Sequence, residues 1–152
     1  MTASMGRDHD RIELGVLTFA QDRGAVPGAR RWVMDRLANS DGQMLTADAM
    51  DNVELCAGEV IANAVVHGGD GKITVTLYVL GTPAVRVEVR DTGSQEGCTP
   101  VRRDVPLTAT NGRGLGIVGA LASRWGRHIE PATGHTVVWF EVDGPPDPPG
   151  AR

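Results

Sequence analysis

The sequence predicts an α+β fold, a two-layer α/β sandwich in which a mixed, mostly antiparallel sheet carries its helices on one face. Three observations lead to this prediction. The segment 11–19 alternates apolar and polar residues, which is typical of a half-buried strand. Two further strand segments, at 72–80 and 84–90, are joined by a short turn, which favours an antiparallel hairpin. Helical periodicity occurs in three other stretches, and 152 residues suffice for one domain with its own core.

The N-terminal half is predicted to contain one strand followed by two helices. Residues 11–19 (RIELGVLTF) alternate apolar and polar side chains and indicate a strand. Pro27 opens a helical stretch, because proline suits the first turn of a helix. The longest helix runs from about 46 to 67, with apolar residues at steps of three and four. Thr46 is its expected N-cap, and Gly68-Gly69 its expected end.

The C-terminal half is predicted to contain a hairpin, a long loop, a helix and a last strand. Strands at 72–80 and 84–90 form the hairpin. A glycine cluster after the loop leads into a helix at 115–125. The segment 136–142 (TVVWFEV) indicates a strand that is buried on both faces. The order is therefore strand, helix, helix, hairpin, loop, helix and strand.

Composition and charge exclude several classes of protein. The net charge of −4 argues against nonspecific binding to nucleic acid or to a membrane surface. Cys56 and Cys98 match no metal-binding spacing and no disulfide framework, so both are expected to be reduced thiols. No apolar run approaches the roughly 18 residues that span a bilayer, and no signal peptide is evident. We expect a cytoplasmic protein with one domain at 11–143 and flexible tails at 1–10 and 144–152.

Three polar side chains share one ridge of the longest helix. Glu59, Asn63 and His67 follow one another in steps of four, which puts them on one side of the helix. An amide oxygen such as that of Asn63 suits Mg²⁺, which prefers hard oxygen ligands and completes its shell with water and phosphates. A carboxylate one turn away suits the deprotonation of an attacking hydroxyl. A solvated polar ridge explains the same pattern, and His67 could equally cap the helix end.

Two further features are ambiguous when each is taken alone. Asp91 closes the second hairpin strand, where a carboxylate could accept a hydrogen bond from an adenine amino group and Gly93 would leave room for the base. An ordinary turn explains these residues too. Glycines at 112–116 (GRGLG) let backbone amides approach a phosphate at a helix N-terminus. The cluster is neither a Walker loop nor a Rossmann fingerprint, because it lacks the Lys-Ser/Thr and the preceding strand.

Taken in order, these segments resemble the three ATP-site boxes of the GHKL superfamily, whose domain is the Bergerat ATP-binding fold. The segments are Glu59-Val-Ile-Ala-Asn63, Asp91-Thr-Gly93 and Gly112-Arg-Gly-Leu-Gly116. Gly134-His135-Thr136 resembles the last element of the family, whose threonine lies near the adenine-binding aspartate. Within the superfamily, EVIANAVVHGG is most similar to stand-alone anti-sigma-factor serine/threonine kinases. The similarity covers roughly residues 11–143.

The resemblance implies a role for each matching position. It makes Asn63 the Mg²⁺ ligand, Glu59 the general base and Asp91 the acceptor for the adenine of ATP. The loop at 94–111 would be the lid over the nucleotide. The resemblance also makes Gly93 a residue of the base pocket and gives the phosphate cradle as Gly112, Gly114 and Gly116. Leu115 and Thr136 belong to the matching segments. His67 on the ridge and Arg113 within the glycine cluster are further candidates for nucleotide binding.

The function that the resemblance implies is a Mg-ATP-dependent protein serine kinase. Such a kinase binds a sigma factor, phosphorylates a STAS-type anti-sigma antagonist and forms a homodimer. The chain departs from the family at Gln95, which replaces the second glycine of Asp-x-Gly-x-Gly. A non-catalytic ATP-binding module that holds a protein partner is therefore the alternative. The catalytic half of a histidine kinase is disfavoured, because no helical hairpin with a phosphoacceptor histidine precedes the domain.

Overall fold

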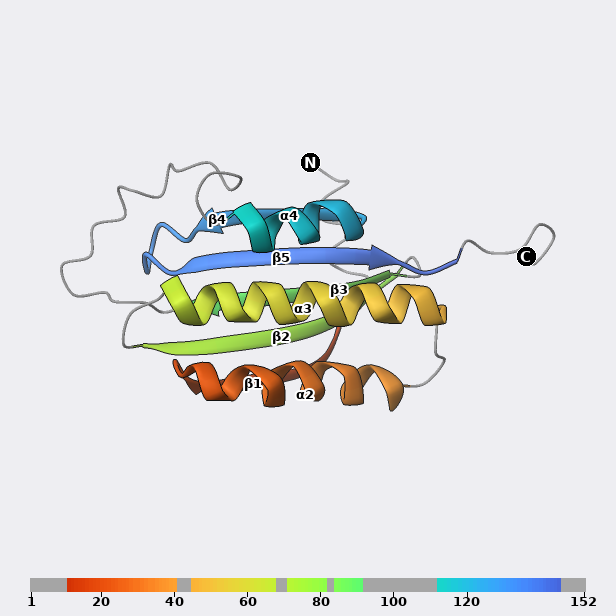
Figure 1. Cartoon of the computed structure of the whole chain (residues 1–152), viewed down its shortest axis with the longest axis horizontal. Coiled ribbons are helices and arrows are strands. Elements are labelled where there is room, and N and C mark those ends of the chain that lie inside the picture. The colour runs from red at the N-terminus through yellow and green to blue at the C-terminus, as the bar shows by residue number, and fades with distance from the viewer. Residues whose placement is uncertain (1–10, 41–44, 68–70, 82–83, 92–111, 146–152) are drawn as a thin grey trace.

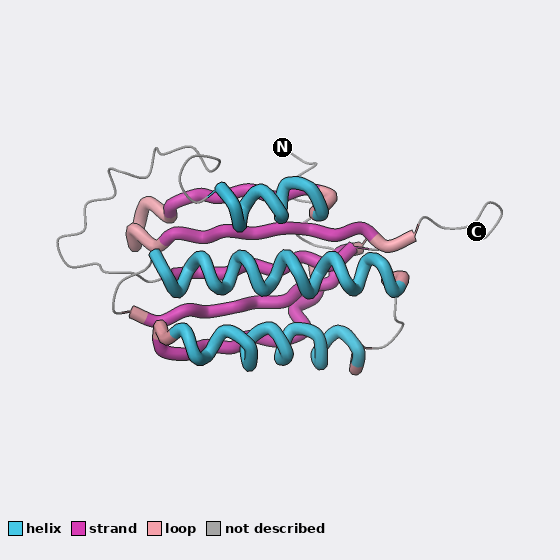
Figure 2. Tube along the Cα trace, viewed as in Figure 1, coloured by secondary structure: helices cyan, strands magenta, loops and turns pink. Residues whose placement is uncertain are grey.

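A five-stranded sheet with helices on one face forms the protein (Figures 1 and 2), as the sequence predicts. The computed structural model describes residues 11–40, 45–67, 71–81, 84–91 and 112–145. The strands are β1 (Ile12–Ala20), β2 (Lys72–Leu80), β3 (Ala84–Asp91), β4 (Arg124–Ile129) and β5 (Thr136–Asp143). They lie in the order β1-β2-β3-β5-β4, and each described pairing is antiparallel.

The helical layer covers one face of the sheet, with the longest helix in the middle (Figure 1). It consists of the 3₁₀ turn η1 (Arg23–Ala25) and the helices α2 (Val26–Ala38), α3 (Ala47–His67) and α4 (Gly112–Leu121). Pro27 lies in the first turn of α2, as predicted. The Thr46 hydroxyl accepts a hydrogen bond from the Ala49 N–H at 3.1 Å, which confirms the predicted N-cap of α3. No helix in the described part of the chain is long and apolar enough to cross a membrane.

The core between the layers consists mainly of valine, isoleucine, leucine and alanine. Every second residue of β3 faces the helices, so Val85, Val87 and Val89 are buried there. Phe140 of β5 is the largest of the fully buried side chains. On the opposite face of β5, Val137 is also buried, at 2% exposure. The prediction that this strand is buried on both faces is thereby confirmed.

One predicted element is wrong: the helix expected at 115–125 is shorter and is followed by a strand. The helix begins at Gly112, within the glycine cluster and not after it, and it ends at Leu121. The Ser123 N–H then donates to the Glu141 carbonyl at 2.8 Å, which starts the pairing of β4 with β5. The β4 sequence RWGRHI has no alternating pattern, so its extended conformation is imposed by β5.

Several predictions concern segments outside the described residues. These are the tail at 1–10, most of the tail at 144–152, the glycines after α3, the centre of the hairpin turn, and the lid at 94–111. They stay predictions.

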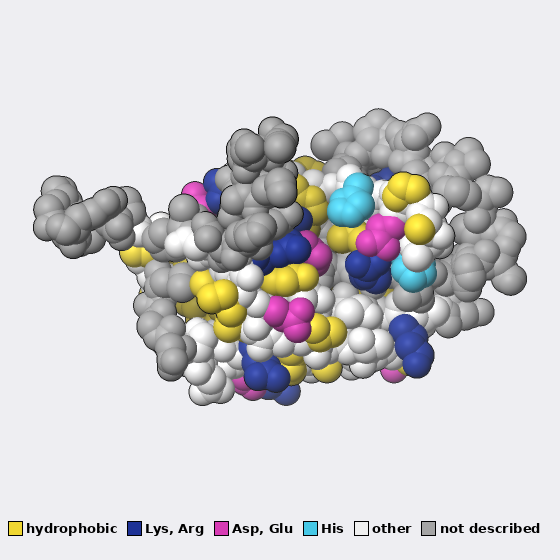
Figure 3. Space-filling model, turned by 180° about the vertical axis from the view of Figure 1, so that it is seen from behind, with side chains coloured by type: hydrophobic (Ala, Val, Ile, Leu, Met, Phe, Trp, Pro, Cys, Tyr) yellow, Lys and Arg dark blue, Asp and Glu magenta, His cyan; other side chains and the backbone are white. Residues whose placement is uncertain are grey.

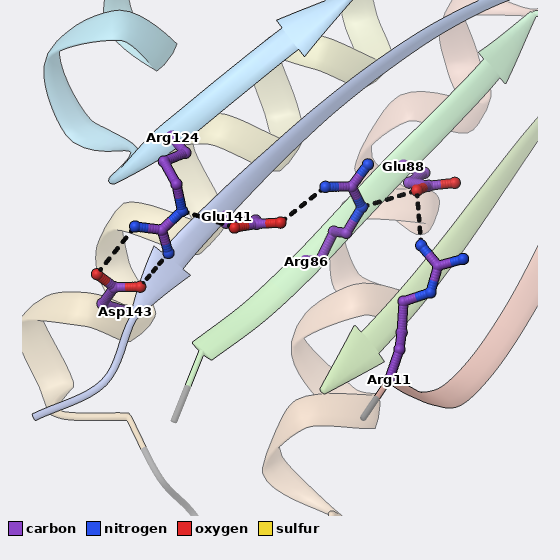
Figure 4. A network of polar contacts seen from close by, with 6 residues as sticks. All are labelled: Arg11, Arg86, Glu88, Arg124, Glu141 and Asp143. Carbon is purple, nitrogen blue, oxygen red and sulfur yellow. Dashed lines mark hydrogen bonds and ion pairs between the residues drawn. The ribbon is translucent and has the colours of Figure 1, made fainter. Parts of the chain in front are cut away.

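The face of the sheet opposite the helices carries a chain of ion pairs. Apolar side chains lie between charged ones on this face (Figure 3). Glu141 is only 2% exposed and accepts hydrogen bonds of 2.7 Å from both Arg86 and Arg124. Burial alone would raise the pKa of Glu141, but the hydrogen bonds from Arg124 and Arg86 hold it below its ordinary value. We call the whole set the ion-pair ladder (Figure 4): Arg11, Glu88, Arg86, Glu141, Arg124 and Asp143.

Gly126 of β4 leaves room for the indole ring of Trp139, its partner on β5. A Cβ on Gly126 would lie 2.9 Å from two atoms of that ring, while the Arg86 guanidinium lies 4.1 Å from the ring centroid. We expect Gly126→Ala to destabilise the protein by about 1–3 kcal/mol, because the rigid ring must shift. Gly28→Ala in α2 is the control, since its Cβ would meet nothing within 4 Å. Urea unfolding measures the free energy of unfolding of both variants. An equal change in Gly126→Ala and Gly28→Ala would contradict the prediction.

Candidate nucleotide-binding site

Glu59 and Asn63 lie on the side of α3 that is turned away from α2. Both side chains are half-buried, at the edge between core and solvent that the sequence predicts. Gly58 faces α2, because a Cβ there would lie 3.2 Å from the Cδ of Arg30. At about 100° per residue, Glu59 and Asn63 are turned about 100° and 140° from Gly58. Since α3 lies between α2 and α4 (Figure 1), the ridge faces α4 and solvent.

Cys56 lies on the same side of α3 as Glu59 and is fully buried. Burial, and secondly the nearby charge of Glu59, raise the pKa of the Cys56 thiol to about 11. The thiol therefore stays protonated at neutral pH and does not act as a nucleophile. Cys56 is a free thiol, in agreement with the reduced cysteine that the sequence predicts, whereas Cys98 lies outside the described residues.

Asp91 and Thr136 are direct neighbours on adjacent strands. Asp91 continues the row of valines on β3 that faces the helices, and cross-strand partners share a face. Both side chains are half-buried on the helical side of the sheet. The register thus brings Thr136 beside Asp91, as the resemblance implies. Their role in binding adenine stays a prediction.

The C-terminal end of α3 lies at the same end of the sheet as Asp91. The Gln21 N–H donates to the Gly71 carbonyl at 3.3 Å, and its side-chain amide donates to two carbonyls in the last turn of α3 at 3.1 and 2.9 Å. Ile73, two residues after Gly71, pairs with Asp91. The turn that follows Asn63 therefore adjoins the strand end that carries Asp91. Sequence patterns did not single out Gln21, because its partners are remote backbone atoms.

The N-terminus of α4 also lies at this end. Through Ser123, the C-terminus of α4 is joined to Glu141, far along β5 from Thr136. The ten residues of α4 extend about 15 Å, and the strand from Glu141 back to Thr136 extends about 17 Å. In Figure 1, α4 lies over β4 and runs in the same direction as β5, so its first turn points toward the end of the sheet at which β5 begins. Three separate segments of the sequence thus lie toward one end of the molecule.

Only part of the predicted site lies within the described residues. Gly93, the lid at 94–111 and Gln95 lie outside them. His67, Gly112, Arg113 and Gly114 belong to helices, but their side-chain surroundings are not described. Leu115 is buried in the core at 3% exposure, whereas Gly116 beside it is exposed. Leu115 therefore anchors the first turn of α4 and can contribute only its backbone to a site.

The described part of the site fits a magnesium-bound nucleotide in its chemistry. The Asn63 amide offers a hard oxygen atom for Mg²⁺, and the Asp91 carboxylate offers a hydrogen-bond acceptor for a base. The N-terminus of α4 supplies backbone N–H groups that attract phosphate. A Cβ on Gly116 would meet no described atom within 4 Å, so packing among the described residues does not require glycine there. A glycine that packing does not require is consistent with close approach by a ligand.

Comparison with known proteins establishes the family. The model of the histidine kinase-like ATPase domain matches residues 19–141, so the chain belongs to that family. Among solved structures, it is similar to the crystal structure of the RsbU and RsbW domains of Rv1364c from Mycobacterium tuberculosis, with a TM-score of 0.59 and 19% sequence identity. That alignment covers 87% of this chain and 34% of the other, and it supports the fold alone. No curated protein matches.

Proposed function

We propose that this protein is a Mg-ATP-dependent protein serine kinase that binds a sigma factor and phosphorylates a STAS-type anti-sigma antagonist. The observation that carries the proposal is the convergence of three segments at one end of the sheet: the Glu59–Asn63 ridge, the Asp91–Thr136 pair and the start of α4. Membership in the histidine kinase-like ATPase family supports ATP as the nucleotide. The similarity of EVIANAVVHGG to anti-sigma-factor kinases supports the choice of substrate.

Each segment has a distinct task in the proposed reaction. Asp91 accepts a hydrogen bond from the adenine amino group, and Thr136 adjoins that contact. The backbone N–H groups at the start of α4, from Gly112 to Gly116, bind the phosphates where the helix dipole is positive. Asn63 is the protein ligand for Mg²⁺, which when bound neutralises phosphate charge.

Glu59 is the proposed general base. Its carboxylate lies one turn from Asn63 on the same ridge, so a serine hydroxyl directed at the phosphates could donate its proton to it. The helix N-terminus stabilises the charge that develops on the transferred group. His67, Arg113 and Gly93 complete the proposed nucleotide contacts.

The proposed partners are the sigma factor and the antagonist, and we propose a homodimer as the functional unit. Phosphorylation would keep the antagonist from displacing the sigma factor. The alternative is a module that binds ATP and a protein partner without transferring phosphate, and Gln95 in the first glycine box favours it. Transfer of the ATP γ-phosphate to a serine of a STAS-type protein distinguishes the two.

Calorimetric titration of ATP, with Mg²⁺ and with EDTA, tests the site itself. We expect the wild-type protein to bind ATP more tightly with Mg²⁺. Asp91→Asn is expected to weaken binding by roughly 10- to 100-fold, because it removes a charged hydrogen-bond acceptor. Asp51→Asn on the exposed side of α3 is the control and should bind as the wild type does. If folded wild-type protein fails to bind millimolar ATP, the nucleotide site does not function.

A further inference from the structure

Gln21 joins the end of β1 to the end of α3. Its side-chain Nε2 donates to the Ala64 carbonyl at 3.1 Å and to the Val65 carbonyl at 2.9 Å. Its backbone N–H donates to the Gly71 carbonyl at 3.3 Å. One residue thus binds the chain on both sides of the connection between α3 and β2, although it is more than forty positions away in sequence.

The two carbonyls that Gln21 binds lie in the last turn of α3, which ends at His67. Carbonyls at the C-terminus of an α-helix run out of intrahelical N–H partners and are commonly bound by groups from outside the helix. A single NH₂ group with two hydrogens donates to both Ala64 and Val65. Gln21 is therefore a C-terminal cap that comes from another element of the fold.

Asn63 is directly before the capped carbonyls. Without a cap, the last turn of a helix tends to fray, and a side chain on that turn loses its fixed direction. Val65 is 8% exposed and faces the core, and Ala64 packs against the core beside it, so Gln21 adds to the apolar contacts of this turn. The cap thus acts on the residue that is predicted to hold Mg²⁺.

We propose that Gln21 is a positioning residue for the nucleotide site, which fixes Asn63 by capping the C-terminus of α3. This inference rests on the proposed function. It assigns no contact with the nucleotide to Gln21 itself. The Oε1 atom of Gln21 is buried and has no hydrogen-bond donor among the described residues, so only the amide nitrogen acts. A side chain that has a hydrogen-bond donor but lacks this acceptor should therefore be able to take over the role of Gln21.

The test compares three variants with the wild type by calorimetric titration of ATP, with Mg²⁺ and with EDTA. Gln21→Met removes the donor at similar volume, and Gln21→Lys restores a donor with a charge that suits a helix C-terminus. Thr46→Ala removes the N-cap at the other end of α3 and serves as the control for loss of helix stability.

In the wild type, Mg²⁺ is expected to raise the affinity for ATP above the affinity in EDTA, and we call this increase the Mg²⁺ gain. Gln21→Met should reduce the Mg²⁺ gain by roughly tenfold, because two hydrogen bonds are lost. Affinity in EDTA, which depends on Asp91, should not change. Gln21→Lys and Thr46→Ala should keep the wild-type gain. Among the three variants, only Gln21→Met should show faster amide hydrogen exchange in the last turn of α3. Unchanged exchange in the rest of the protein would show that this variant is folded and altered only locally.

The possible outcomes distinguish the positioning role of Gln21 from the proposed function of the protein. An unchanged Mg²⁺ gain in Gln21→Met would overturn the role of Gln21 and leave the nucleotide site intact. An equal loss in Thr46→Ala would also overturn it, because the effect would then reflect helix stability. If the wild type itself shows no Mg²⁺-dependent binding, the proposed function fails and the role of Gln21 fails with it.

Discussion

Replacing Glu59 by glutamine is expected to slow phosphoryl transfer to a serine acceptor by about 10²- to 10⁴-fold, the usual contribution of a general base. The amide cannot accept the hydroxyl proton, although its size and position are the same. ATP binding should not change, because Glu59 has no assigned contact with the nucleotide. The measurement is single-turnover transfer of labelled γ-phosphate from ATP to a STAS-type antagonist.

Glu54→Gln provides the matched control on the same helix. Glu54 is exposed, and five residues before Glu59 it is turned about 140° around α3. Transfer by Glu54→Gln should therefore equal that of the wild type. If Glu59→Gln or Glu59→Ala transfers phosphate at the wild-type rate, Glu59 is not the base. If no variant and no wild-type protein transfers phosphate while ATP still binds, the non-catalytic alternative is correct.

Replacing Arg86 by methionine is expected to lower the free energy of unfolding by about 3 kcal/mol. Arg86 donates at 2.7 Å to both Glu88 and Glu141 and lies 4.1 Å from the Trp139 ring centroid. Its loss leaves the buried carboxylate of Glu141 with Arg124 alone. An incompletely paired buried charge is costly, whereas an exposed ion pair contributes little. Urea unfolding at neutral pH measures the change.

A double-mutant cycle and a pH series test the cause of that loss. Glu141→Leu combined with Arg86→Met should cost less than the sum of the single changes, because no charge is then left buried. Since the pKa of Glu141 is lowered in the folded protein, its contribution to stability is present above the unfolded pKa of about 4.3 and is lost as the pH falls through the folded pKa. The difference in free energy of unfolding between the wild type and Arg86→Met should therefore become smaller in acid. A difference that does not depend on pH would contradict the role of Glu141.

Local patterns predicted most of the fold. Alternation located β1, the short turn between two strand segments located the hairpin of β2 and β3, and a continuous apolar run located β5. Steps of three and four residues located α3, and Thr46 marked its beginning. These signals depend only on which side of an element faces the core. Such information is present in each segment by itself.

β4 was missed because its stability comes from its partner. RWGRHI contains a glycine and two arginines, and neither favours a strand. The glycine is required by Trp139, and Arg124 is required by Glu141 and Asp143. Each of these requirements comes from a residue of β5 that the local pattern does not contain.

The candidate site was predicted in its residues but not in its arrangement. The motif boxes named Asn63, Asp91 and Thr136, and the resemblance implied that the last two lie close together. Only strand pairing brings them together, and only packing puts the Asn63 end of α3 over the same end of the sheet. No motif marked Gln21, whose hydrogen bonds reach carbonyls more than forty positions away.

By itself, the sequence determined the fold class, the longest helix with its N-cap, four of the five strands and the order of the motif boxes. These follow from periodicity and from residue types at short spacing. Only the tertiary structure decided the fifth strand, the partners of Glu141 and the cap on α3. Those depend on contacts between distant segments, where pairing and burial outweigh the weak preferences of the local sequence.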